Sequence, residues 1–71
     1  MSDYVKFKQA TKGNKRFVAV KKDDIVGYYN DDYSYQGERI YVTVIQVVRS
    51  NDLVGINVSN TFDEVEKLLN E

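Results

Sequence analysis

The sequence predicts an α+β fold, a small twisted antiparallel β-sheet or partly open barrel of about five strands with one C-terminal helix. Three observations predict it. Short segments of alternating or continuous apolar residues are typical of strands. Turn-forming residues separate these segments. Only residues 60–70 combine a helix-start signal with apolar residues at helical spacing, so the chain is expected to contain one helix, at its end.

Each expected strand has a recognisable boundary. In chain order the strands are Val5 and Phe7 with their flanking lysines, Arg16 to Lys21, Ile25 to Tyr29, Arg39 to Arg49, and Leu53 to Val58. Residues 11–15 (TKGNK) predict a hairpin turn between the first two strands, because glycine and asparagine accept positive φ. Residues 22–24 form a polar corner and residues 50–52 a tight turn, while Gly27 indicates a bulge or a close backbone approach.

The predicted helix spans Asn60 to Asn70. Thr61 and Glu64 have the spacing of a capping box, in which each side chain accepts a hydrogen bond from an otherwise unpaired amide of the first turn. One apolar stripe runs along the helix at the spacing of a buried face. Its members are Phe62, Val65, Leu68 and Leu69.

The fourth strand is apolar on both faces, which a single short helix does not explain. A sheet with one solvated face alternates apolar and polar residues, and neither this strand nor the second one does. Either the sheet curls into a small barrel, or the second face meets another chain. For the second alternative we predict a symmetric homodimer. Its interface would contain Val18, Val20, Tyr41, Thr43, Ile45 and Val47.

Composition excludes several classes of function. The 71 residues allow one domain, residues 1–71, with one small core. The chain contains no cysteine and no histidine, so we expect no enzyme activity, no metal site and no cofactor. A net charge of −1 gives no overall field that attracts nucleic acid or an anionic membrane. Without an apolar leader or a membrane-length apolar run, the expected location is the cytoplasm.

Residues 27–39 (GYYNDDYSYQGER) contain four of the six tyrosines and are the main candidate site. Tyrosine and arginine are enriched at interaction hot spots, so the segment is predicted as a recognition loop for a larger protein. Its partner-binding residues would be Tyr28, Tyr29, Asp31, Asp32, Tyr33, Tyr35 and Arg39. The alternative is a hairpin connection whose tyrosines pack on the neighbouring sheet. The spacing of Asp31 and Asp32 does not match a calcium loop.

Basic residues concentrate in the first third of the chain. They are Lys6, Lys8, Lys12, Lys15, Arg16, Lys21 and Lys22. The favoured interpretation is an edge strand that lysines protect from aggregation. An alternative is weak nucleic-acid binding by Lys6, Lys8, Lys15 and Arg16 with nearby tyrosines, which could stack single-stranded bases. A further alternative is a small ligand enclosed by the tyrosine segment and the sheet.

Three stretches follow a known order: FVAVKKDDIVGYYND, then YVTVIQV, then GINVSNTFDEVEKLL. Over residues 17–69 this order resembles small FlbD-type flagellar proteins and short phage-encoded proteins, and it is loosely similar to LytTR-type DNA-binding domains. The matching positions are Ile25, Tyr28, Thr61, Glu64, Val65 and Leu68. The resemblance implies the sheet-plus-helix fold. With the composition, it leads us to expect a small phage-type or regulatory protein that binds and modulates a larger partner.

Overall fold

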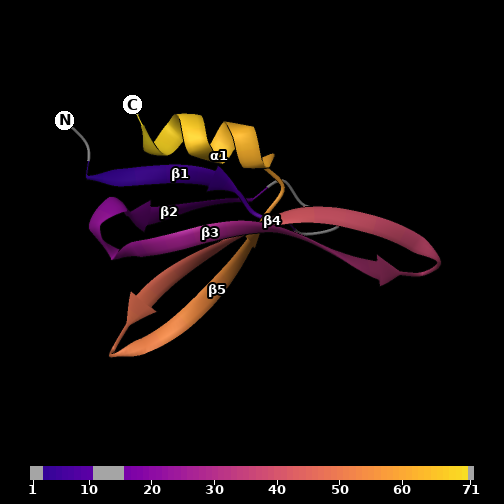
Figure 1. Cartoon of the computed structure of the whole chain (residues 1–71), viewed down its shortest axis with the longest axis horizontal. Helices are drawn as coiled ribbons and strands as arrows, with labels where there is room; N and C mark the ends of the chain where they lie inside the picture. Colours follow the sequence, from indigo (N-terminus) through magenta and orange to yellow (C-terminus); the bar gives the residue numbers. More distant parts are fainter. Residues whose placement is uncertain (1–2, 11–15, 71) are drawn as a thin grey trace.

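The computed structural model describes residues 3–10 and 16–70, and it contains antiparallel strands followed by one helix (Figure 1). In chain order the elements are β1 (Tyr4–Lys8), β2 (Phe17–Lys21), the short 3-10 helix η1 (Lys22–Asp24), β3 (Ile25–Tyr35), β4 (Glu38–Arg49), β5 (Asp52–Val58) and α1 (Phe62–Leu69). This confirms the predicted order of five strands and a C-terminal helix. The predicted turn over residues 11–15 lies outside the described residues.

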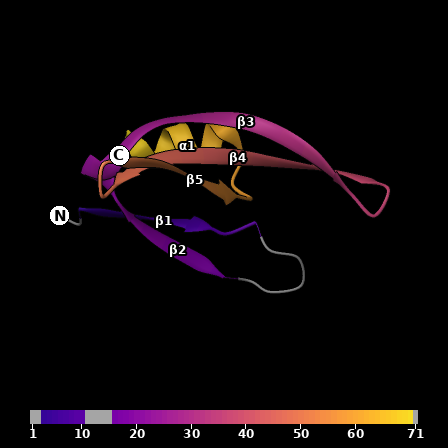
Figure 2. The same cartoon turned by 90° about the horizontal axis from the view of Figure 1, so that it is seen from below.

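The strands form two separate antiparallel sheets, one with the order β1–β2 and one with the order β3–β4–β5. The sheets meet where β1 ends beside the end of β5. There Gln9 forms an isolated bridge with Val58, and the backbone N–H of Ser59 donates to the carbonyl of Lys8 at 2.8 Å. The described strands therefore do not close into a barrel. Figure 2 shows the β1–β2 hairpin facing the curved three-stranded sheet.

The core lies between the β1–β2 hairpin, the three-stranded sheet and the helix. Every element except β3 and η1 contributes at least one buried apolar side chain to this cluster. The cluster consists of Phe7, Val20, Ile45, Val47, Val58 and Val65. We call the sheet face that carries Ile45 and Val47 the inner face, and the opposite face the outer face. Thr43, also buried, donates its hydroxyl proton to the carbonyl of Asn60 at 2.7 Å, so its burial leaves no unpaired polar group.

The tyrosine segment is a long hairpin, which corrects the expected loop over residues 30–38. Strand β3 continues to Tyr35, and β4 begins at Glu38. Only Gln36 and Gly37 connect them, with φ of 51° and 80°. Positive φ at both central residues is the requirement of a type I′ turn, whose twist matches the twist of the flanking strands. The hairpin therefore projects beyond β5 as a ribbon (Figure 1).

Two local signals in the sequence are confirmed. The register of the β3–β4 pairing shifts between Ile25 and Gly27, as expected for a bulge at the glycine. At the helix start, the hydroxyl of Thr61 accepts from the amide of Glu64 at 3.1 Å, and the carboxylate of Glu64 accepts from the amide of Thr61 at 2.9 Å. The capping box is complete, and the helix begins at Phe62, two residues later than expected.

The predicted dimer interface needs a correction, because most of its residues belong to the core of the single chain. Val20, Thr43, Ile45 and Val47 are at most 2 % exposed, so a second chain has no access to them. Val18 is partly buried against the same core. Tyr41 differs from these, with 75 % of its surface exposed. The β1–β2 hairpin and the helix together cover this inner face. On the outer face of β4, Val48 is 41 % exposed, whereas Val42 and Val44 are each 6 % exposed.

Candidate functional site

The outer face of the β3–β4 hairpin gathers most of the exposed tyrosines. Side chains of a strand alternate between faces, so Tyr29, Tyr33 and Tyr35 all lie on the outer side. Their exposed fractions are 44 %, 39 % and 46 %. Because β3 and β4 pair in register, their cross-strand neighbours lie on the same side. We call this surface the tyrosine face, and it consists of Tyr29, Asp31, Tyr33, Tyr35, Glu38, Ile40, Val42 and Val44.

Aliphatic side chains of β4 form the floor of the tyrosine face. Tyr29 pairs directly with Val44, and Tyr33 with Ile40, so each ring has a branched side chain beside it. Val44 also extends over Gly55 of β5, where an added Cβ would lie 3.1 Å from its Cγ1. Tyr29 and Tyr33 therefore each have an aliphatic neighbour on this face, and they remain 44 % and 39 % exposed.

The apolar surface continues past the tyrosines toward the other end of the sheet. Val48 pairs with Leu53 next to the β4–β5 turn, and they are 41 % and 61 % exposed. The sequence had indicated a second apolar face on β4. The predicted dimer interface used the β4 residues of the inner side. The apolar residues of the outer side were therefore missed, namely Ile40, Val42, Val44, Val48 and Leu53.

The structure divides the predicted partner-binding residues between the two faces. Tyr28 lies on the inner face, where its ring is 5.0 Å from that of Phe62 between centroids. Asp32 and Arg39 also lie on the inner side, paired by a salt bridge of 3.0 Å. Both of their side chains are exposed, so the pair contributes at most about 1 kcal/mol. Only the remaining four predicted residues belong to the tyrosine face, namely Tyr29, Asp31, Tyr33 and Tyr35.

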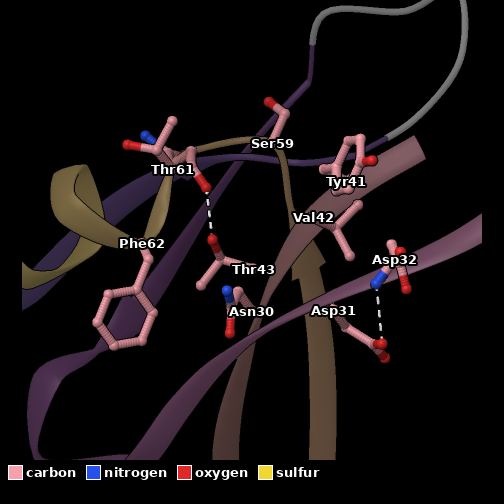
Figure 3. Close-up of a pocket in the computed structure, with 10 residues that line it drawn as sticks. Asn30, Asp31, Asp32, Tyr41, Val42, Thr43, Ser59, Thr61 and Phe62 are labelled. Carbon is pink, nitrogen blue, oxygen red and sulfur yellow. Dashed lines mark hydrogen bonds between the residues drawn. The ribbon is translucent and has the colours of Figure 1, made fainter. Parts of the chain in front are cut away.

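Asp31 has a local role beside its place on the tyrosine face. Its carboxylate accepts a hydrogen bond from the amide of Asp32 at 2.8 Å (Figure 3). β3 is an edge strand, and a side chain that occupies one of its amides makes pairing with another strand less favourable. The tyrosine face is therefore better suited to contacts made by side chains than to the addition of a strand.

An open pocket of about 440 Å³ lies between the β3–β4 hairpin and the start of α1 (Figure 3). It is lined by Asn30, Asp31, Asp32, Tyr41, Val42, Thr43, Ser59, Asn60, Thr61 and Phe62. Several of its polar groups form hydrogen bonds, either with one another or with residues outside the pocket. Asn60 accepts from Thr43 through its carbonyl and from the amide of Lys8 through its side chain, while Thr61 pairs with Glu64. In the described part of the chain, no buried side-chain nitrogen or oxygen lacks a hydrogen-bond partner.

At the start of α1, the carboxylate of Glu64 lies next to the positive end of the helix. The hydrogen bond from the backbone of Thr61, together with the contact to its hydroxyl, lowers the pKa of Glu64, and the charge of Lys8 adds to the effect. The positive end of the helix therefore already holds a carboxylate. The hydrogen bonds of Thr43, Asn60 and Thr61 leave fewer polar groups in the pocket to fix the orientation of a small ligand.

Over residues 3–10 and 16–70, no three acidic side chains gather in a way that could hold a metal ion. Among the same residues, no helix has the length and apolar character needed to cross a membrane.

Comparisons with family models, curated proteins and solved structures find no match for the chain. The resemblance to FlbD-type and LytTR-type proteins therefore stays a prediction.

Proposed function

We propose that the chain is a small non-enzymatic module that binds a larger protein through its tyrosine face. One observation carries the proposal: Tyr29, Tyr33 and Tyr35 stand in a row on one side of a projecting hairpin, each 39 % to 46 % exposed. Tyrosine provides a large contact area at a low entropy cost, because it has only two side-chain torsions. The aliphatic cross-strand neighbours of Tyr29 and Tyr33 would restrict their rings, so that part of this cost would be met before the partner binds.

The charges on the tyrosine face suggest the chemistry of the partner. Asp31 and Glu38 are its acidic members, and they lie beside the apolar cross-strand neighbours Val42 and Tyr35. A complementary surface would be apolar at its centre, with lysine or arginine at its rim. Most of the affinity would come from the aromatic contacts, while the rim charges would steer association.

The test is a native pull-down in 0.5 M salt, roughly, with bound proteins identified by mass spectrometry. At this ionic strength purely electrostatic contacts are strongly screened. A double variant, Tyr29→Ser with Tyr33→Ser, should lose a protein that the unmodified chain retains. The matched control is Tyr41→Ser, which removes an exposed tyrosine from the inner side of the same hairpin. Loss of the same protein by both variants, or by neither, would contradict the proposal.

A second copy of this chain is the alternative occupant of the tyrosine face. Two-fold dimers dominate among soluble homo-oligomers, and the outer face of β4 carries Ile40, Val42, Val44 and Val48, interrupted only by Gln46. Sedimentation equilibrium at high micromolar concentration separates the two cases. A dimer that the double variant converts to a monomer would identify the second copy as the occupant. A monomer at all concentrations leaves the larger protein as the proposed partner.

A further inference from the structure

The solvent side of the β1–β2 hairpin carries a separate surface of different chemistry. Strand alternation and register place one set of residues on this side, with Val5, Phe7, Val18 and Val20 on the side of the core. We call the solvent side the basic face, and it consists of Tyr4, Lys6, Lys8, Phe17, Ala19 and Lys21. All of these residues are basic or aromatic except one alanine. Exposed Arg16 directly precedes Phe17 in the chain, just outside β2 at the end of the ribbon.

The aromatic residues of the basic face are unusually open to solvent. Tyr4 is 57 % exposed and Phe17 is 58 % exposed. The ammonium group of Lys6 lies 5.3 Å from the centroid of the Phe17 ring. A phenylalanine that is open to water and lies beside a cation offers a flat apolar surface next to a positive charge. This is the combination that stacks a nucleic-acid base and neutralises the phosphate attached to it.

We propose that the basic face binds single-stranded nucleic acid, with bases stacked on Phe17 and Tyr4 and phosphates beside Lys6, Lys21 and Arg16. Tyr4 and Phe17 lie at opposite ends of the five-residue ribbon, about 13 Å apart along the strands at 3.3 Å per residue. A strand of a few nucleotides reaches both rings. An unpaired strand is favoured over a duplex, because bases within a duplex cannot stack on a side chain without leaving their partners.

The charges of the rest of the molecule set the expected strength. The chain as a whole carries −1, so the attraction is local to this face. Lys8 also interacts with Glu64, since its charge helps to lower the pKa of that carboxyl. Lys6, Lys21 and Arg16 are then the main phosphate contacts. Neutralising three phosphates of a single strand gives a slope of about −2 for the logarithm of the affinity against the logarithm of salt concentration.

The experiment is fluorescence anisotropy with a labelled 15-nucleotide oligothymidylate, measured between 25 and 200 mM salt, roughly, where the electrostatic contribution is large. We expect binding with the salt slope given above and weaker binding to a duplex of equal length. Phe17→Ser should weaken binding by about fivefold or more through lost stacking. Lys6→Gln should make the slope shallower by about 0.7. Tyr29→Ser, on the tyrosine face, is the control and should bind like the unmodified chain.

Several results would overturn this inference. One is that the chain does not bind the oligonucleotide at about 25 mM salt. Another is that it binds duplex and single strand with equal affinity. A third is that a folded Phe17→Ser variant binds with unchanged affinity. Circular dichroism checks that this variant folds, and Tyr4→Ser takes its place in the test if it does not. Loss of a retained protein in the pull-down by the Phe17→Ser variant, without oligonucleotide binding, would assign the basic face to a protein instead. Because the two faces carry different variants, failure here leaves the proposal for the tyrosine face intact.

Discussion

Tyr28 and Tyr29 are neighbours in the chain but lie on opposite faces of the sheet, Tyr28 against the ring of Phe62 and Tyr29 beside Val44. The 5.0 Å separation and the 44° tilt between the rings of Tyr28 and Phe62 are within the favoured range for aromatic pairs. This contact joins β3 to the start of the helix. One tyrosine therefore supports the fold, while its neighbour belongs to the surface proposed for recognition.

Serine substitutions at these two positions should separate stability from binding. Tyr28→Ser removes a partly buried ring that packs on the core, so we expect the free energy of unfolding to fall by about 2–4 kcal/mol. Tyr29→Ser should cost less than about 1 kcal/mol, because this ring is 44 % exposed. Urea denaturation followed by circular dichroism measures both. Equal losses at the two positions would mean that the faces are assigned incorrectly.

Ile45 tests whether the inner face is core. Ile45→Ala should lower the free energy of unfolding by about 2–5 kcal/mol, because the side chain is fully buried. Val48→Ala, at a position 41 % exposed on the outer face, should cost less than about 1 kcal/mol. Ile45→Lys should prevent folding altogether, since it places an unpaired charge in the core. A folded, monomeric Ile45→Lys protein would restore the inner face as a dimer interface.

Local signals in the sequence predicted the helix and its cap well. The Thr61 and Glu64 pair lies within one helical turn, and its hydrogen bonds depend on those few residues alone. The bulge at Gly27 was predictable for the same reason. The strands Arg16 to Lys21 and Leu53 to Val58 were each predicted to within one residue of the observed bounds.

The sides of β4 could not be assigned from the sequence, because both carry apolar residues. Which side becomes core depends on where the β1–β2 hairpin and the helix pack, and this is set by contacts distant in sequence such as the bridge between Gln9 and Val58. The length of the β3–β4 hairpin was missed for a different reason. Asn30, Asp31 and Asp32 disfavour strands in isolation, but each pairs with a strand-forming residue of β4, namely Thr43, Val42 and Tyr41.

The turn at the hairpin tip should respond to backbone changes alone. A Cβ added at Gly37 would have nothing within 4 Å, so Gly37→Ala tests only the cost of φ at 80°. We expect a loss of about 1–2 kcal/mol in the free energy of unfolding. The matched change is Ser50→Gly in the β4–β5 turn, where φ is 51° and glycine should stabilise by about 0.5–1 kcal/mol.

Thermal or urea unfolding measures both turn variants. A neutral Gly37→Ala would show that the tip adopts another turn in solution. A destabilising Ser50→Gly would show that the serine side chain contributes more than its unfavourable backbone conformation costs.

The capping box should make stability depend on acid. The pKa of Glu64 is lowered in the folded chain, first by the hydrogen bond from the amide of Thr61 and then by the Thr61 hydroxyl. The folded state therefore favours the ionised carboxyl more than the unfolded state does. This contribution is fully present above the ordinary glutamate value of 4.5, and it is lost as the pH falls through the lower folded pKa.

Glu64→Gln provides the sharpest test of this pH dependence. Glutamine can still accept the hydrogen bond from Thr61, so the variant should remain folded at neutral pH with a slightly lower melting temperature. It should lose less stability than the unmodified chain between pH 5 and pH 3, roughly, because it lacks the titrating group. Thr61→Ala removes the hydroxyl and should cost about 1 kcal/mol at neutral pH. The measurement is the melting temperature of each protein across this pH range. If the melting temperatures of Glu64→Gln and the unmodified chain fall equally with pH, Glu64 is excluded as a source of the acid sensitivity.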